Sequence, residues 1–434
     1  MFKRTLIVFQ SIVLVSASTA FGQADSVQTQ LSLKSAMEYA VKNNLSVKNS
    51  QIDLQIAKKK IWETTAIGLP QVNGTANYQH TFNVPTADFG GQPIKLGTAD
   101  NTTWDVTVSQ LIFSGEYIVG LRAAQVYKEV SERNLIKSEN DIRESVSQSY
   151  YLALVVDENV RILKETQVVT NNTLSDVIAL GKEGIVEEIN VDQVRILKAT
   201  IDNAVSNLER QAALAKKLLL FQLGYDLSVP VTLTDNLNDI VSSTEFTRYL
   251  DLSLTLENNA DYNVVKVAEK LQKLNVDRYK TMFLPTISGF YRHQEQLKTA
   301  AFNFQPKDVA GITLSLPIFT SGSRLSQLSQ AKKEYEKTKN NRLSVERGLN
   351  LQFEQSKNTF ASSYSSYLTH KENLTLSKKI FDQTMVKYKE GVASSTDLHQ
   401  AETQLLDTQS KYFSALSELL NAKVSLDKLT SVQN

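Results

Sequence analysis

Two segments of the chain alternate strictly between apolar and polar residues, and the first begins directly after the pair Leu69-Pro70. A period of two residues predicts β-strands with one apolar and one polar face, here at about residues 71–83 and 102–113. The polar face consists of Asn73, Thr75, Asn77 and Gln79 in the first strand and of Thr103, Asp105, Thr107 and Ser109 in the second. Such strands need water on one face and an apolar medium on the other, which is either lipid or a protein core.

The chain between and after these strands has the pattern of very long helices. It contains no proline over residues 94–229 and 318–434, and apolar residues recur there at steps of three and four. A continuous helix from Glu116 to Leu180 would be roughly 100 Å long at 1.5 Å per residue. A break around Gly184 follows, and the returning helix ends at Gly224, a residue type typical of helix C-caps.

The second half of the chain repeats the first. Leu-Pro-x-Val-x-Gly at residues 69–74 recurs as Leu-Pro-x-Ile-x-Gly at residues 284–289, an offset of 215 residues. In the first half an amphipathic helical pattern over residues 33–67 leads into this motif. Two further strands are predicted at about residues 286–297 and 309–319. As in the first half, a helix precedes the first strand of the pair and a long helix follows the second.

The second long helix begins near Arg324 and breaks at Lys-Glu-Gly-Val (389–392), the counterpart of Lys-Glu-Gly-Ile (182–185) in the first half. A repeat of this length is too long for a solenoid unit and indicates a duplicated half-molecule. The expected organisation is a first repeat at residues 23–224, a linker at 225–250 and a second repeat at 251–434, after a signal peptide at 1–22.

The first 22 residues have the composition of an export signal. Lys3 and Arg4 precede a short apolar core at residues 6–15, and small residues suited to signal peptidase stand at 20–22. The apolar core is too short to span a bilayer. We therefore expect a mature chain that begins near Gln23 and lies outside the cytoplasm, without a lipid anchor because the chain has no cysteine.

Composition and motifs argue against several classes of protein. The 47 basic and 46 acidic residues give a net charge of +1, so the chain lacks the excess of positive charge that is typical of nucleic-acid-binding proteins. There is no cysteine, the four histidines lack metal-ligand spacing, and no phosphate-binding glycine loop or nucleophile motif occurs. We therefore expect no enzyme activity, no resident metal and no cofactor.

The four predicted strands cannot form a closed barrel by themselves, because about eight strands are the minimum. If their apolar faces contact lipid, open strand edges are too costly, and several chains must share one barrel. The alternative is a small sheet that caps a soluble periplasmic coiled-coil scaffold. The pairing of four strands with two long helical hairpins behind an export signal favours the membrane interpretation.

The Leu-Pro strand entries, the sequence Leu-Pro-Ile-Phe-Thr-Ser-Gly at 316–322, the duplicated hairpins and their glycine-containing tips resemble the TolC-type outer-membrane efflux channels. The resemblance covers essentially the whole mature chain. It implies a mainly α-helical fold with membrane β-structure: a homotrimer with a 12-stranded barrel in the outer-membrane lipid and a periplasmic α-helical barrel tunnel.

In function, the resemblance implies a passive duct through which drugs, metals or other toxic compounds leave the cell. Its partners would be a periplasmic adaptor protein and an inner-membrane transporter. A duct for type I protein secretion remains an alternative, because the inner-membrane partner selects the cargo.

The resemblance also implies a gate at the periplasmic end of the tunnel. Asp397 matches a constriction aspartate of the family, and Gln400 replaces a second one. Tyr388 matches a tyrosine of the closing network, Asn190 stands at the position of its carboxylate partner, and Ala393 replaces an arginine. Alternatively, Asp397 is an ordinary first-turn acid after Ser-Ser-Thr at 394–396.

The hairpin tips are the sites at which the family's adaptors dock. In this chain they carry Gly184 and Ile185 in the first half and Gly391 and Val392 in the second. The glycines could equally serve only as turn residues with a positive φ angle.

Overall fold

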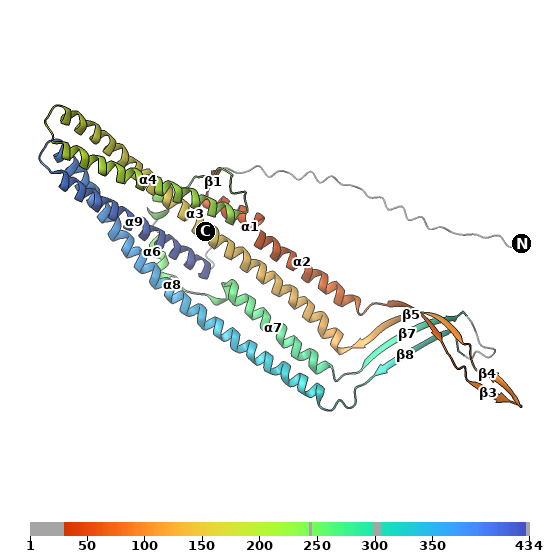
Figure 1. The fold of residues 1–434 in the computed structure, drawn as a ribbon. Helices are drawn as coiled ribbons and strands as arrows, with labels where there is room; N and C mark the ends of the chain where they lie inside the picture. The colour runs from red at the N-terminus through yellow and green to blue at the C-terminus, as the bar shows by residue number, and fades with distance from the viewer. Residues whose placement is uncertain (1–29, 243–244, 298–304, 431–434) are drawn as a thin grey trace, which may run out of the picture.

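The computed structural model describes residues 30–242, 245–297 and 305–430. The expected export signal at residues 1–22 therefore lies outside the described residues. The described chain forms a long helical body with a β-sheet at one end and the tips of two helical hairpins at the other (Figure 1). No helix in these three ranges has the length and apolar character needed to cross a membrane.

The helical body contains four helices of the first half and three of the second. They are α1 (Leu33–Asn43), α2 (Leu45–Ala66), α3 (Gly115–Lys182), α4 (Glu188–Leu223), α7 (Ala260–Thr281), α8 (Ser323–Lys389) and α9 (Ser395–Thr430). Helices α2, α3, α7 and α8 lie side by side in this order, while α4 packs on α3 and α9 packs on α8 and α3. The two long helices expected from the proline-free runs are present and run without interruption to the tips.

The amphipathic pattern over residues 33–67 forms two helices, and the second begins directly after Asn44, as Asn259 directly precedes α7 in the second half. The backbone of Asn44 is extended, and its side chain caps α2 by accepting a hydrogen bond from the Ser46 amide at 2.8 Å. The Asn44 amide also donates to the Gln222 carbonyl at 2.8 Å, which ties the break to the end of α4.

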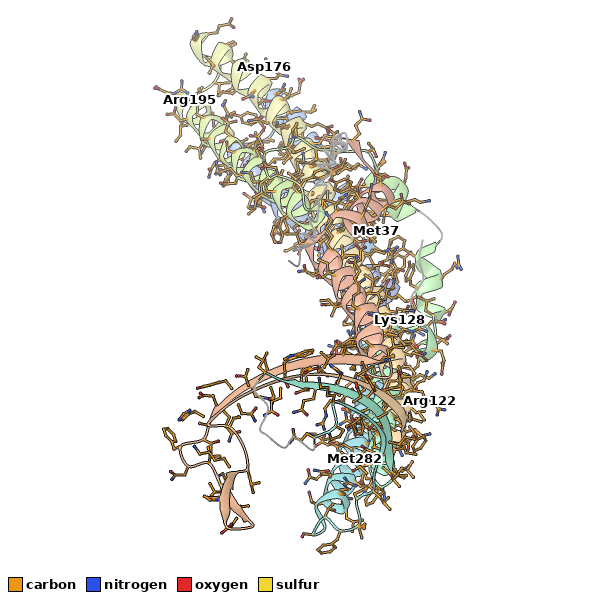
Figure 2. The ribbon with its side chains drawn as sticks, turned by 90° about the vertical axis from the view of Figure 1, so that its right-hand side faces the viewer. Met37, Arg122, Lys128, Asp176, Arg195 and Met282 are labelled. Atoms are coloured by element: carbon orange, nitrogen blue, oxygen red, sulfur yellow. The ribbon has the colours of Figure 1, made fainter. Side chains whose placement is uncertain are left out.

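The main sheet contains β2 (Gln71–His80), β5 (Asp100–Ser114), β7 (Thr286–Gln296) and β8 (Asp308–Ser315), in that order and all antiparallel. In this sheet β2 and β8 are the edge strands of the described chain. Figure 2 shows the sheet curving away from the helices. Each strand of the first half thus has its counterpart in the second half.

The ends of β2 and β8 and the loop between the first two strands differ from the expectation. β2 ends at His80, which pairs with Asp100, the first residue of β5. β8 ends at Ser315, because Pro317 has no backbone N–H for a further ladder hydrogen bond. The stretch expected as a loop between the first two strands holds a small hairpin, β3 (Thr86–Phe89) and β4 (Gln92–Lys95), around two glycines with positive φ angles.

The linker after α4 is more regular than the expected 225–250 irregular segment. It contains β6 (Thr232–Leu233), which pairs in parallel with β1 (Gln30–Leu31), and the short helical elements α5 (Leu237–Ser242), α6 (Glu245–Arg248), η1 (Tyr249–Asp251) and η2 (Leu256–Asn258). Together with α1, these elements cover the middle of the long helices. Here Tyr150 is fully buried and donates to the Leu31 carbonyl at 2.9 Å, and Phe246 stacks on Phe360.

The core is largest at this middle level and becomes thinner toward the tips. The main apolar cluster joins α1, α3, α4, α8 and α9 with the linker elements. Beyond it, a smaller cluster on α3, α4, α8 and α9 is followed by a last one around Val177, Val191 and Val194. Local stability follows the number of buried apolar contacts, so the tips are the part of the body that separates most easily.

Candidate functional site

The two hairpin tips have the same backbone design. Gly184 and Gly391 have φ angles of 72° and 71°, and a Cβ atom at either glycine would meet nothing within 4 Å. A positive φ angle is therefore the structural reason for glycine at both positions. The following residues, Ile185 and Val392, are 66% and 77% exposed. The tips thus present two large apolar side chains to the surroundings at the free end of the molecule (Figure 1).

Polar contacts join the two tips to each other. The Tyr388 hydroxyl donates to the backbone carbonyl of Asn190 at 3.4 Å, and the Ser395 hydroxyl donates to the Asn190 side-chain oxygen at 2.9 Å. Lys389 forms an ion pair with Asp176 at 2.9 Å. We call these five residues the tip contacts; they connect α8 and α9 to the hairpin of α3 and α4. Figure 2 labels Asp176 near the end of α3.

The structure brings the expected pair Tyr388 and Asn190 together, although the hydroxyl reaches the backbone of Asn190 and not its side chain. Burial raises the pKa of Tyr388, so the phenol stays neutral and able to donate. Ser395, Lys389 and Asp176 were not identified from the sequence. In the sequence, these three residues are distinguished only by their closeness to the tip glycines: Asp176 lies shortly before Gly184, and Lys389 and Ser395 lie on either side of Gly391.

Asp397 takes part in a helix cap. Its carboxylate accepts from the Ser394 amide at 2.9 Å and from the Ser394 hydroxyl at 2.7 Å, and its own amide donates back to that hydroxyl at 3.2 Å. This is a reciprocal arrangement of the capping-box type at the start of α9. The Ser394 hydroxyl, followed by the Ser394 amide, lowers the pKa of Asp397 and keeps the carboxylate charged. Gln400 lies one turn further along and is exposed.

The polar residues of the sheet share one face across three strands. Asn73, Thr75 and Asn77 of β2 lie opposite Thr107, Asp105 and Thr103 of β5, and these lie opposite Arg292, Gln294 and Gln296 of β7. Gln79 lies opposite Asn101, and Ser109 lies opposite Gln71. Thr75 and Thr107 both donate to the carboxylate of Asp105. All eight polar strand residues singled out in the sequence therefore lie on the same face of the sheet.

The opposite face of the sheet is apolar where the strands leave the helices. Val72, Val108, Tyr291 and Ala310 form one row across the four strands. Within the described ranges, no group of three or more histidine, aspartate or glutamate side chains is arranged to hold a metal ion. The sheet thus has one polar face and an opposite face that is apolar near the helices, while farther out that opposite face carries His80, Asp100, His293, Glu295 and Asp308.

Comparison with known proteins finds a family model that matches the second half of the chain, a related protein and solved structures of the same fold. Residues 252–432 match the model of a family described as outer membrane efflux protein. The chain is 21% identical over 411 residues to the cobalt-zinc-cadmium resistance protein CzcC of Cupriavidus metallidurans, an alignment that covers 92% of this chain and 90% of CzcC.

Solved structures with the same fold include outer-membrane channels. The outer membrane protein VceC of Vibrio cholerae has a TM-score of 0.72 at 16% identity, covering 92% of this chain and 95% of VceC. CusC has a TM-score of 0.73 at 16% identity, covering 92% and 91%. The open state of the MtrE outer membrane channel of Neisseria gonorrhoeae has a TM-score of 0.70 at 16% identity, covering 92% and 88%.

Proposed function

We propose that this chain, whose second half matches the outer membrane efflux protein family and whose fold is that of TolC-like channels, is the outer-membrane duct of a tripartite efflux system. The family and the fold are those of passive channels and not of enzymes. The observation that carries the proposal is the sheet. It has one polar face, an opposite face that is apolar near the helices, and two edge strands, and it stands at the end of a very long helical body.

The two edges of the sheet support a trimer. In lipid, each unpaired N–H or C=O group of β2 or β8 costs several kcal/mol, so both edges need partners from other chains. We propose that three chains assemble, because three sheets of four strands give 12 strands, enough to close a barrel. The β8 edge of one copy would then pair with the β2 edge of the next.

In this barrel the polar surface from Asn73 to Ser109 lines a water-filled pore, and the row from Val72 to Ala310 contacts outer-membrane lipid. The helical body continues the duct into the periplasm, as in outer-membrane channels of known structure. The exposed apolar tips, Gly184-Ile185 and Gly391-Val392, are proposed as the surface on which a periplasmic adaptor docks. An inner-membrane transporter would complete the system.

The cargo is proposed to be small toxic solutes, metal ions among them. The match to a cobalt-zinc-cadmium resistance protein supports this choice over protein secretion. Passage of either cargo needs only a wide polar duct, so the helical body and the sheet serve both equally well.

The experiment that tests the duct uses single-cysteine variants, since the chain has no cysteine of its own. Asn77→Cys on the polar face is expected to react with a water-soluble, membrane-impermeant thiol reagent in outer-membrane fractions. Val72→Cys on the apolar face, the matched control, is expected to react only with a lipid-soluble reagent. Crosslinking of the detergent extract is expected to give trimers. Extraction of the protein without detergent, or labelling of Asn77→Cys only from the lipid phase, would refute the proposal.

Asp397 is proposed to contribute a ring of three negative charges at the periplasmic constriction, in addition to capping α9. Asp397→Ala is therefore expected to lower the preference of the reconstituted channel for cations, measured as a shift in reversal potential across a salt gradient. Ser394→Ala removes the cap partner but leaves the carboxylate, and it is expected to keep the cation preference. If both variants behave like the wild type, Asp397 serves only as a helix cap.

A further inference from the structure

Glu402 on α9 is a carboxylic acid buried without a hydrogen-bond partner. Its residue exposure is 1%, and neither carboxylate oxygen has a hydrogen-bond partner among the described residues. In the part of the chain that the structure describes, the side chain paired with it by distance is the His399 imidazole, one turn earlier, whose Nδ1 lies 3.4 Å from Oε2 and whose side chain is 63% exposed. Burying an ionised carboxylate without compensating hydrogen bonds is strongly unfavourable, so such a group becomes neutral or moves into water.

Glu402 lies on a buried side of α9, next to Ala401 and one turn from Leu398 and Leu405. These three neighbours belong to the distal cluster, in which they pack against Leu163 of α3, Leu197, Ile201 and Val205 of α4, and Phe381 and Met385 of α8. This cluster lies between the main core and the tip contacts. Because only 1% of Glu402 is exposed, a displacement of α9 from the helices packed on it would increase the access of the carboxyl to water.

Charged groups on the helices that pack against this cluster are engaged elsewhere or point to solvent. On α4, Lys198 and Asp202 pair with each other, and Gln167 of α3 donates to Asp202 at 2.7 Å. On α3, Lys164 pairs with Glu209 and Glu165 pairs with Arg161. On α8, Lys378, Lys379 and Asp382 are exposed. Burial alone raises the pKa of Glu402, to about 7.

We propose that Glu402 is a proton-linked switch of the periplasmic end, which favours packing of α9 on α3 and α4 when the carboxyl is protonated and favours their separation when it is ionised. This proposal rests on the proposed channel function and adds a regulation to it. The exposed His399 beside the carboxyl marks the side from which a proton and water can reach it.

The sign of the effect follows from linkage. An exposed glutamate has the ordinary pKa of 4.5, so at low pH the carboxyl is neutral whether α9 is packed or displaced. As the pH rises from about 4.5 to about 7, the displaced form ionises first and becomes favoured, and above 7 the effect levels off. The ratio of displaced to packed protomers is expected to rise by a factor of up to about 300 over this window.

The test is single-channel recording of the reconstituted trimer between about pH 5 and about pH 8. The wild type is expected to increase its open fraction with pH, while Glu402→Gln and Glu402→Leu stay at the low-pH level throughout. Asp407→Asn, which removes an exposed α9 carboxylate paired with Lys411, is the matched control and is expected to keep the wild-type dependence. His399→Gln is expected to keep it too, which separates Glu402 from the titration of the neighbouring imidazole.

Infrared difference spectra of the same detergent-solubilised trimers supply a readout that does not depend on conduction. The wild type is expected to show the C=O band of a protonated carboxylic acid near neutral pH, and both Glu402 variants are expected to lack it. Equal pH dependence of opening in the wild type and in both Glu402 variants would overturn the switch and leave the channel function intact. Absence of conductance in every variant at every pH would instead overturn the channel function, and the switch with it.

Discussion

Replacement of Gly115 with valine is expected to abolish assembly of the membrane-inserted trimer. β5 passes into α3 at Gly115 without a connecting loop, and the start of α3 is packed against the end of α7. A Cβ atom at Gly115 would lie 2.8 Å from the Cβ of Thr281 and 2.9 Å from Cδ1 of Leu284. Relief of such contacts would move α3 away from α7 where helices become strands, and the register of β5 with β7 would be lost with it.

The expected cost grows with side-chain size. Overpacking of a tight contact costs about 1–3 kcal/mol, which is the expectation for Gly115→Ala, and the larger side chain of valine exceeds it. Gly120→Ala is the matched control on the same helix, because a Cβ there meets only Thr64 at 3.9 Å and alanine favours the helix by up to about 1 kcal/mol. The measurement is the yield of detergent-extracted trimer and its dissociation temperature. Wild-type values for Gly115→Val would show that the close approach of α3 and α7 does not position the strands.

The fold was predictable from the sequence where backbone chemistry leaves few options. Pro70 and Pro285 directly precede β2 and β7, because proline ends a helix. A strand in which every second residue is polar cannot lie stably in a fully apolar core. The long proline-free helices and their glycine turns followed from equally local signals. The match between the two halves then predicted that the second pair of strands would join the first.

Other features were not predictable because they depend on contacts between distant segments. The Asn44 side-chain amide donates to the Gln222 carbonyl far along the chain, and nothing near Asn44 in the sequence indicates that partner. The ion pair of Lys389 and Asp176 likewise depends on how the two hairpins lie against each other. Glu402 is a charged residue within an apolar pattern, and from the sequence alone it would be placed at the surface. Helix α9, however, packs on both α8 and α3, so more of its surface is buried than in a helix with one neighbour.

Reversal of the charge at Lys389 is expected to open the periplasmic end of the channel. Lys389 and Asp176 connect α8 to α3 close to the tips, where the apolar core is thinnest. An exposed ion pair of this kind contributes at most about 1 kcal/mol, and a single such pair would be hard to detect. In a symmetric trimer that opens in one step, however, three pairs break together, and the contributions add to about 3 kcal/mol, or roughly a hundredfold in the open-to-closed ratio.

Lys389→Glu replaces this attraction with repulsion from Asp176, so the open fraction is expected to rise by about a hundredfold or to saturate. The matched control is Lys387→Glu, which changes the same charge two residues earlier on α8. Lys387 is exposed and forms no ion pair with any residue that the structure describes. It changes the net charge of the tip equally and is expected to leave the open fraction near the wild-type level.

The double variant Asp176→Lys with Lys389→Glu restores the pair with exchanged signs and is expected to return the channel to wild-type opening. Because the pair is exposed, the difference between Lys389→Glu and the wild type is also expected to shrink at high salt, where the screening length falls to about 3 Å at 1 M. If the double variant opens as readily as Lys389→Glu alone, the ion pair does not hold the tips. Resistance to opening must then lie in the bonds of Tyr388 and Ser395 to Asn190 and in the distal cluster behind them.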